Sequence, residues 1–301
     1  MIILNLTDGL GNQMFQYAFA RYLQSVYDGK VYLIMTMLGR RHRRDYELHY
    51  FKLNKNVIIP NQLLQLLLYC FLRIYRIYLN RFKGYSLIDR KGYELFASHG
   101  YYTTNNVYCC FPFLWTKKRI KFVWGFFQNE KWFVDIKSCL LQEYKWKNLN
   151  FRQDIIKLAE FISSKQSVCV HIRREDYTKV ARFMVCNEDY YRRGIDYIRS
   201  LFPDSELFIF SNSHDDILWI KNHYHFGGDI TYVDMNNKGI EDFFLMRLCK
   251  HFVISNSTYS WWAAYLSESQ DKVVVAPHPW VKSECEQCGI YCDGWKVIDI
   301  I

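Results

Sequence analysis

The second half of the chain alternates between short apolar runs and longer segments in which apolar residues recur at helical spacing. The runs are Val168–Ile172, Leu207–Phe210, Ile230–Val233, Phe252–Ile254 and Val273–Ala276. Continuous apolar strands that alternate with helices are typical of a parallel sheet covered by helices on both faces. The pattern therefore predicts an α/β fold for this half.

The first half begins in the same way. Ile2–Leu6 predicts a strand, the glycine turn Asp8-Gly9-Leu10-Gly11-Asn12 follows it, and residues 13–27 have the spacing of an amphipathic helix. Between residues 35 and 125 the pattern becomes irregular, basic and aromatic, and it predicts no regular order of strands and helices.

A polar, lysine-rich stretch at residues 142–150 is the candidate linker between the two halves. It predicts two α/β domains, residues 1–145 and 150–301, with a ligand cleft between them, because clefts between domains are preferred binding places.

Composition adds a preference for anions. Half of the 301 residues are apolar, which is ample for a core, and 39 basic against 30 acidic residues give a net charge of +9. Nucleotide diphosphates, nucleic acid and anionic membranes all fit that charge. The densest basic cluster, residues 40–44, is short and stands without a zinc-finger or RNA-recognition signature, so we predict no nucleic-acid partner.

The chain opens directly into its first strand without a signal-peptide pattern, and it contains ten cysteines. These features predict free thiols and a cytoplasmic location. The apolar stretch Leu63–Leu72 has about half the length that crossing a bilayer requires. It predicts a core helix, and the alternative is a face that lies on an anionic membrane, at its inner surface.

Two observations bear on metals. Cys285, Cys288 and Cys292 have C-x2-C-x3-C spacing and His278 lies nearby, so a metal site there stays open as an alternative. An Asp-x-Asp pair, which carries a divalent cation in many nucleotide-sugar enzymes, is missing from the sequence. We therefore predict no metal in the reaction.

The candidate chemistry lies at the carboxyl end of the first strand of the second half. His171-Ile172-Arg173-Arg174-Glu175-Asp176-Tyr177 follow directly on apolar residues, and open α/β sheets bind ligands at such strand ends. Arginines make charge-assisted bonds to phosphate oxygens, and an adjacent carboxylate orients them or accepts a proton. The segment predicts a diphosphate clamp, and a solvated surface ion pair is the alternative.

Two further strand ends have polar character. The turn Gly9-Leu10-Gly11-Asn12-Gln13 places amides at a helix start, and Ser255-Asn256-Ser257-Thr258 precede a predicted helix at 259–265. Both favour anions or polar ligand groups. The alternatives are a structural turn for the first and helix capping alone for the second.

In this order, the three motifs resemble glycosyltransferase family 11, the α-1,2-fucosyltransferases. Further segments look similar too, namely Gly125-Phe126-Phe127-Gln128, Asp189-Tyr190-Tyr191, Asp242 with Leu245-Met246, and Val275-Ala276-Pro277 with Trp280. The resemblance therefore runs nearly from end to end.

The resemblance implies a GT-B-like architecture of two Rossmann-like domains. It also implies transfer of L-fucose from GDP-L-fucose to the 2-hydroxyl of a terminal galactoside, with inversion and without a metal or other cofactor, in the synthesis of surface polysaccharide or oligosaccharide.

Carried onto this chain, the resemblance places the donor in the carboxyl-terminal domain. The residues that it implies for donor binding are His171, Arg173, Arg174, Asn256, Ser257 and Thr258. The residues that it implies for the acceptor side of the cleft are Gly9, Gly11, Asn12 and Gln13. We expect Arg173, Asp176 and Glu175 to take part in catalysis, with Asp8 and Glu188 as further candidates for the base.

The chain departs from the family pattern at two glycine positions, which hold Asp8 and Glu175. A side chain at such a position disfavours a backbone with positive φ. A transferase for another nucleotide sugar, an inactive relative and a non-catalytic sugar-binding or membrane-surface module therefore stay open as alternatives.

Overall fold

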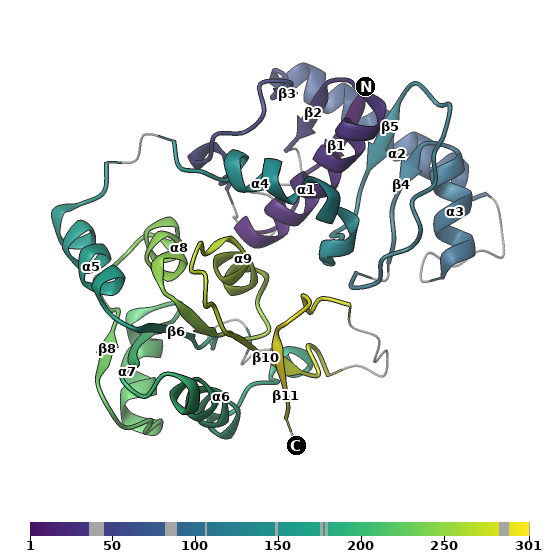
Figure 1. Cartoon of the computed structure of the whole chain (residues 1–301). Helices are drawn as coiled ribbons and strands as arrows, with labels where there is room; N and C mark the ends of the chain where they lie inside the picture. Colours follow the sequence, from purple (N-terminus) through teal and green to yellow (C-terminus); the bar gives the residue numbers. More distant parts are fainter. Residues whose placement is uncertain are drawn as a thin grey trace. The chain divides into compact units, whose positions relative to one another are not determined.

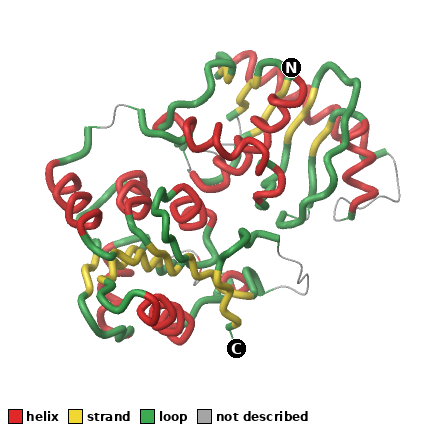
Figure 2. The backbone as a smooth tube through the Cα atoms, viewed as in Figure 1, coloured by secondary structure: helices red, strands yellow, loops and turns green. Residues whose placement is uncertain are grey.

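The computed structural model describes residues 1–35, 45–81, 89–105, 107–147, 150–174, 177, 180–282 and 289–300. The chain divides into two compact units, Met1–Leu149 and Asn150–Ile301. Each unit is a parallel sheet with helices packed on it, as the ribbon and the tube both show (Figure 1, Figure 2).

Unit 1 has a five-stranded sheet in the order β3-β2-β1-β5-β4. Its strands are β1 Ile2–Asn5, β2 Val31–Ile34, β3 Val57–Ile58, β4 Tyr101–Tyr102 and β5 Lys121–Val123. Its helices are α1 Leu10–Tyr27, α2 Gln62–Leu79, α3 Arg90–Ser98 and α4 Lys137–Glu143.

The strand order of unit 1 reverses between β1 and β5, which pair in parallel. Such a reversal is where open α/β sheets bind ligands, because the loops that leave the two strands diverge there. The glycine turn follows β1 at this point, and residues 125–128 follow β5. The two segments meet, since the side-chain amide of Gln128 donates a hydrogen bond from Nε2 to Asn12 Oδ1 over 2.7 Å.

Unit 2 has a six-stranded sheet in the order β11-β10-β9-β6-β7-β8. Its strands are β6 Ser167–His171, β7 Glu206–Phe210, β8 Ile230–Tyr232, β9 His251–Val253, β10 Val274–His278 and β11 Lys296–Asp299. Its helices are α5 Gln153–Ser164, α6 Glu188–Leu201, α7 His214–His223, α8 Gly239–Leu248 and α9 Thr258–Leu266.

The reversal of strand order in unit 2 lies between β6 and β9. These strands pair in parallel, with Val168 opposite His251 and Val170 opposite Val253. Their carboxyl ends therefore lie side by side. This is how two motifs more than 80 residues apart, the one after His171 and the one before Thr258, come to the same edge of the sheet.

The core of unit 2 is formed by apolar strand residues and by one face of α6. Gly194 of α6 permits this packing, because a Cβ there would lie 2.8 Å from Val253 Cγ1 and 3.2 Å from Val275 Cγ1. The helix thus lies closer to β9 and β10 than one with a larger residue at this position would.

The α/β fold with two parallel sheets confirms the predicted fold class. The predicted strands and the helices at 13–27 and 259–265 all occur, with boundaries shifted by a few residues. The irregular region 35–125, in which only the helix at Leu63–Leu72 is predicted, contains β3, α2, α3, β4 and β5.

The core helix predicted at Leu63–Leu72 is present and contributes Leu72 to the core, but only one of its sides is buried. The helix is α2, it continues to Leu79, and many of its apolar side chains are exposed. None of the helices in the described part of the chain combines the length and apolarity that crossing a bilayer requires.

Candidate donor-binding site

His171 is the last residue of β6, and its side chain is almost completely buried. Its Nδ1 lies 3.0 Å from Ser255 Oγ, so the ends of β6 and β9 are joined by a hydrogen bond. Burial, with the nearby Arg173 charge, lowers the pKa of His171 from 6.5 to about 3. The imidazole is therefore neutral at neutral pH, and it orients the strand ends without adding positive charge.

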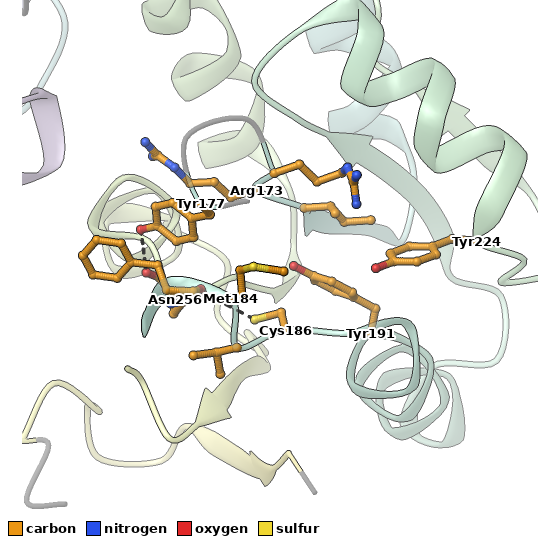
Figure 3. A pocket seen from close by; sticks show the side chains of 11 residues that line it. Arg173, Tyr177, Met184, Cys186, Tyr191, Tyr224 and Asn256 are labelled. Atoms are coloured by element: carbon orange, nitrogen blue, oxygen red, sulfur yellow. Dashed lines mark hydrogen bonds between the residues drawn. The ribbon is translucent and has the colours of Figure 1, made fainter. Parts of the chain in front are cut away.

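Arg173 connects the two motifs at the reversal of strand order. Its Nη1 donates to Ser257 Oγ over 3.3 Å, and its guanidinium carbon lies 4.7 Å from the centre of the Tyr177 ring. The Tyr177 hydroxyl in turn donates to the carbonyl of Asn256 over 2.9 Å, as Figure 3 shows. Arg173 is thus held by groups from both strand ends.

Arg174 takes a different direction. Its guanidinium carbon lies 3.2 Å from the centre of the Trp219 ring, and its Nε lies 3.7 Å from Asp216 Oδ1. Both partners belong to α7. The expected pair of adjacent guanidiniums is therefore split: Arg173 points to the start of α9, and Arg174 packs on α7.

The side chain of Asn256 forms hydrogen bonds within the protein. Its amide donates to the carbonyls of Phe183 and Trp280 over 3.1 and 2.9 Å, and its Oδ1 lies 3.7 Å from Cys186 Sγ. Both amide hydrogens are thus used within the protein, so Asn256 fixes the loops around the site. The donor contact of Asn256 stays a prediction, and the geometry adds a positioning role for its side chain.

The start of α9 retains hydrogen-bonding capacity. Ser257 is the residue before the helix, yet its hydroxyl makes no capping bond and faces Arg173 instead. Thr258, the first helical residue, is half-buried. The first amides of a helix have no partner within the helix and favour negative charge. Arg173 and this helix start together form a positively polarised corner.

A small pocket opens beside Arg173. It has a volume of about 60 Å³, and its lining includes Arg173, Tyr177, Met184, Tyr191 and Tyr224 (Figure 3). Typical small-molecule sites have roughly 300–1,000 Å³. The pocket therefore accommodates only a part of a nucleotide sugar.

Hydrogen bonds of the Gln13 side chain hold the glycine turn of unit 1 in place. The side chain of Gln13 is fully buried, it donates to the carbonyls of Asp8 and Asp45 over 2.8 Å each, and it accepts from the Glu47 amide over 3.0 Å. Gln13 therefore positions the loops after β1 and β2. Gly11 is buried too, whereas Gly9 and Asn12 are half-buried.

Asp8 has a φ of +64°, in the left-handed region that glycine adopts without cost. This is the position at which the resemblance leads us to expect glycine. Aspartate is one of the few other residues that tolerate this conformation. The departure therefore keeps the shape of the turn.

The two carboxylates expected to serve in catalysis, Glu175 and Asp176, lie outside the described residues. So do Cys285 and Cys288 of the alternative metal site. Among the residues that are described, no group of three His, Cys, Asp or Glu side chains is arranged to hold a metal. Glu188, a further candidate base, accepts a hydrogen bond from the His225 amide over 3.1 Å.

Asp242 is a functional candidate that the sequence indicates only through its resemblance to the family. Burial raises the pKa of Asp242 to about 7, although Asn237 donates to its Oδ1 over 2.7 Å. It belongs to the first turn of α8. Tyr259 connects this turn to the site, because its hydroxyl donates to the Gly239 carbonyl and its ring lies 5.8 Å from that of His171.

Comparisons with known proteins agree with this architecture. The family model described as glycosyl transferase family 11 matches residues 1–299. The chain belongs to glycosyltransferase family 11. An α-1,2-colitosyltransferase from Escherichia coli is 31% identical over 294 residues, which cover 94% of this chain and 93% of that protein.

A galactoside 2-alpha-L-fucosyltransferase from Caenorhabditis elegans is 30% identical over 183 residues, 55% of this chain and 49% of that protein. Among solved structures, the NodZ alpha-1,6-fucosyltransferase co-crystallized with GDP matches with a TM-score of 0.55 and 13% identity. That match covers 87% of this chain and 90% of the other. The structural likeness supports the GT-B fold, and the sequence relatives place this family 11 member among the α-1,2-fucosyltransferase homologues.

Proposed function

We propose that this family 11 protein is a galactoside α-1,2-fucosyltransferase that uses GDP-L-fucose. The observation that supports it most directly is the junction of Arg173 with Ser257 where the strand order of unit 2 reverses. A guanidinium beside a helix start is suited to a diphosphate, because both favour negative charge.

The reaction would be a single displacement with inversion. The acceptor 2-hydroxyl oxygen forms a bond to the anomeric carbon of fucose while the bond to the diphosphate oxygen breaks and GDP leaves. Negative charge grows on the diphosphate, so its stabilisation is the largest contribution expected from the protein. Because His171 is neutral, we assign that role to Arg173 and the first amides of α9.

The hydroxyl proton requires an acceptor. We propose Asp176 or Glu175, which follow Arg173 in the sequence, as the general base, with a contribution on the order of 10²–10⁴-fold. The glycine turn, with Asn12 half-buried at its end, is proposed to bind the acceptor sugar. With leaving-group charge carried by Arg173 and the helix start, we propose that transfer needs no metal.

The test is transfer from GDP-fucose to lactose and to type 1 and type 2 galactosides in the presence of EDTA, with linkage analysis of the product. A folded protein that releases no GDP across this panel, or activity that EDTA abolishes and Mg²⁺ or Mn²⁺ restores, would contradict the corresponding part of the proposal.

Arg173→Ala tests the diphosphate assignment. We expect kcat/KM to fall about 10²–10³-fold, the magnitude seen when one preorganised charge donor is removed from a transition state. Arg173→Lys should recover part of this loss, because the charge stays and the fork geometry does not. Arg192→Ala, on the exposed surface of α6, is the matched control and should leave the rate unchanged.

A second donor is favoured by one observation, the similarity to an α-1,2-colitosyltransferase over most of the chain. The alternative function is therefore transfer of another sugar from its nucleotide. Thermal unfolding with GDP-fucose, GDP-mannose and UDP-sugars separates the two, because a ligand that binds the folded state raises its stability by mass action. Stabilisation by another donor with none by GDP-fucose would favour the alternative.

A further inference from the structure

Helix α2 has apolar side chains on two opposite faces. The inner face includes Leu72 and Leu79, which are completely buried and belong to the core cluster of unit 1 with Ile3, Ile34 and Phe122. An amphipathic helix of a globular protein normally has one such face and a polar opposite side. In α2 the opposite side is apolar too.

This outer side is strongly exposed. The exposed fractions are 68% for Leu63, 57% for Leu67, 64% for Ile74 and 59% for Ile77. We define the outer face of α2 as Leu63, Leu66, Leu67, Phe71, Ile74 and Ile77. At 100° per residue these six positions fall within roughly 140° around the helix axis, so they form one continuous stripe. A contiguous exposed apolar patch of this kind marks an interaction site.

The charge around the outer face has one sign. The sequence from residue 48 to 88 contains six lysines and arginines and no aspartate or glutamate. Unit 1 as a whole has 22 basic and 9 acidic residues, a net charge of +13, whereas unit 2 has 17 and 21, a net charge of −4. The positive charge of the protein is thus concentrated in the unit that exposes the apolar stripe.

Basic side chains border the stripe. Arg73 and Arg76 lie over the Trp124 ring, with their guanidinium carbons 6.0 and 4.8 Å from its centre, and Arg81 is exposed just after the helix ends. A helix with apolar residues on one side and cations beside them is typical of segments that lie in the surface of an anionic membrane. Long cationic side chains reach the lipid head groups while the apolar residues enter the acyl boundary.

We propose that the outer face of α2 docks unit 1 on an anionic lipid bilayer. The helix lies on the bilayer and does not cross it. Pairing of this face with a second copy is disfavoured, because two units of net charge +13 would be brought together. The proposal rests on α2 and on the charge of unit 1, and it does not depend on the proposed reaction.

The test measures partition onto vesicles by co-sedimentation at low ionic strength. Vesicles of phosphatidylcholine are compared with vesicles that contain about one third phosphatidylglycerol. We expect the whole protein to bind the anionic vesicles at least about tenfold more strongly, and added salt to weaken this binding.

Leu67→Glu with Ile74→Glu should reduce the partition about tenfold or more, because two carboxylates replace apolar side chains in the centre of the stripe. The matched control is Ile156→Glu with Leu201→Glu, which changes charge equally at exposed apolar positions of unit 2 (37% and 50% exposed). The control should bind within about twofold of the wild type.

Leu67→Gln with Ile74→Gln removes apolar surface without adding charge, and it provides a second test if the glutamate variant is unstable. Thermal unfolding and transfer to a soluble acceptor without vesicles confirm that each variant is folded, and they separate a failure of docking from a failure of the proposed reaction.

Three results would overturn the proposal. They are no binding of the wild type to anionic vesicles, equal loss in the outer-face and control variants, and a dimer in light scattering that the outer-face variant dissociates while vesicle binding is unaffected.

Discussion

Asp242→Asn is the sharpest perturbation of the donor-site region, because it changes one titrating group and almost no volume. The carboxyl of Asp242 has an ordinary pKa of 3.8, and burial raises it to about 7. Between these values the folded protein holds a proton that the unfolded chain has lost. The free energy of unfolding therefore decreases as the pH rises from about 4 to 7, and the full cost is present above pH 7.

The size of this cost follows from the shift. One pKa unit corresponds to about 1.4 kcal/mol, so a shift of about three units costs roughly 4 kcal/mol in the ionised form. The asparagine is neutral at every pH and still offers Oδ1 to the Asn237 amide. We expect the variant to be about 2–4 kcal/mol more stable than the wild type at pH 8 and equal to it near pH 4.

The assay is urea unfolding of both proteins at several pH values between 4 and 8, followed by tryptophan fluorescence. Other groups titrate over the same interval. Their contributions are common to both proteins and cancel in the difference. Leu201→Gln, which changes no titrating group at a position that is 50% exposed, is the control, and its difference should not depend on pH. A stability difference for Asp242→Asn that is constant from pH 4 to 8 would refute the reasoning.

Three further substitutions test the packing of the two units. Glu143→Gln should destabilise unit 1 by about 3–5 kcal/mol, because the carboxylate is buried and makes a 2.6 Å ion pair with Arg21. Thermal unfolding measures this loss of stability, and a loss below about 1 kcal/mol would contradict a structural role for the ion pair. Gly194→Ala should lower the free energy of unfolding by about 1–3 kcal/mol, because the added Cβ would clash with Val253. The control Gly239→Ala should be nearly neutral, because no atom lies within 4 Å of its added Cβ, and equal losses in the two variants would contradict this packing. Asp8→Gly should leave stability unchanged or raise it by up to about 1 kcal/mol, because φ at this position is +64°, and a clear loss of stability would show that the aspartate side chain has another structural role.

The strand ends of unit 2 could be predicted because their signal is local. An apolar run followed at once by His171 or by Ser255 predicts a buried strand and a polar loop without knowledge of the rest of the fold. That the two loops meet depends on the strand order, in which β9 lies beside β6. Their contact therefore followed from the family resemblance and not from the residues themselves.

The direction of Arg174 could not be predicted, because its partners Asp216 and Trp219 lie on a helix that follows a different strand. The same holds for Asp242, whose raised pKa comes mainly from burial, with a smaller contribution from the negative charge of the adjacent Glu241. Such properties arise from tertiary packing, which periodicity does not reveal.

Helix α2 was predicted only in part, for another reason. Its apolar residues lie on two opposite sides of the helix, with Gln65, Arg73 and Arg76 on an arc between them, and the apolar run Leu63–Leu72 indicates a core helix without telling which side is buried. The structure separates a buried face, which includes Leu72, from an exposed face, which includes Leu67. Packing of the core accounts for the buried face of α2 but not for its outer face, and the docking proposal is based on that outer face.

The electrostatics of the donor-site region follow from which groups are charged at neutral pH. His171 is neutral because it is buried beside Arg173, and protonating it would place two cations together in a poorly solvated place. Burial raises the pKa of Asp242 to about 7, so the charge of this region changes within the neutral pH range. If the reaction uses the ionised carboxylate, kcat/KM of the wild type should rise as the pH increases through 7, and Asp242→Asn should remove that rise while it increases stability. A protein that retains a costly buried charge near its candidate site, when asparagine would remove the cost, has the pattern expected of a group kept for function.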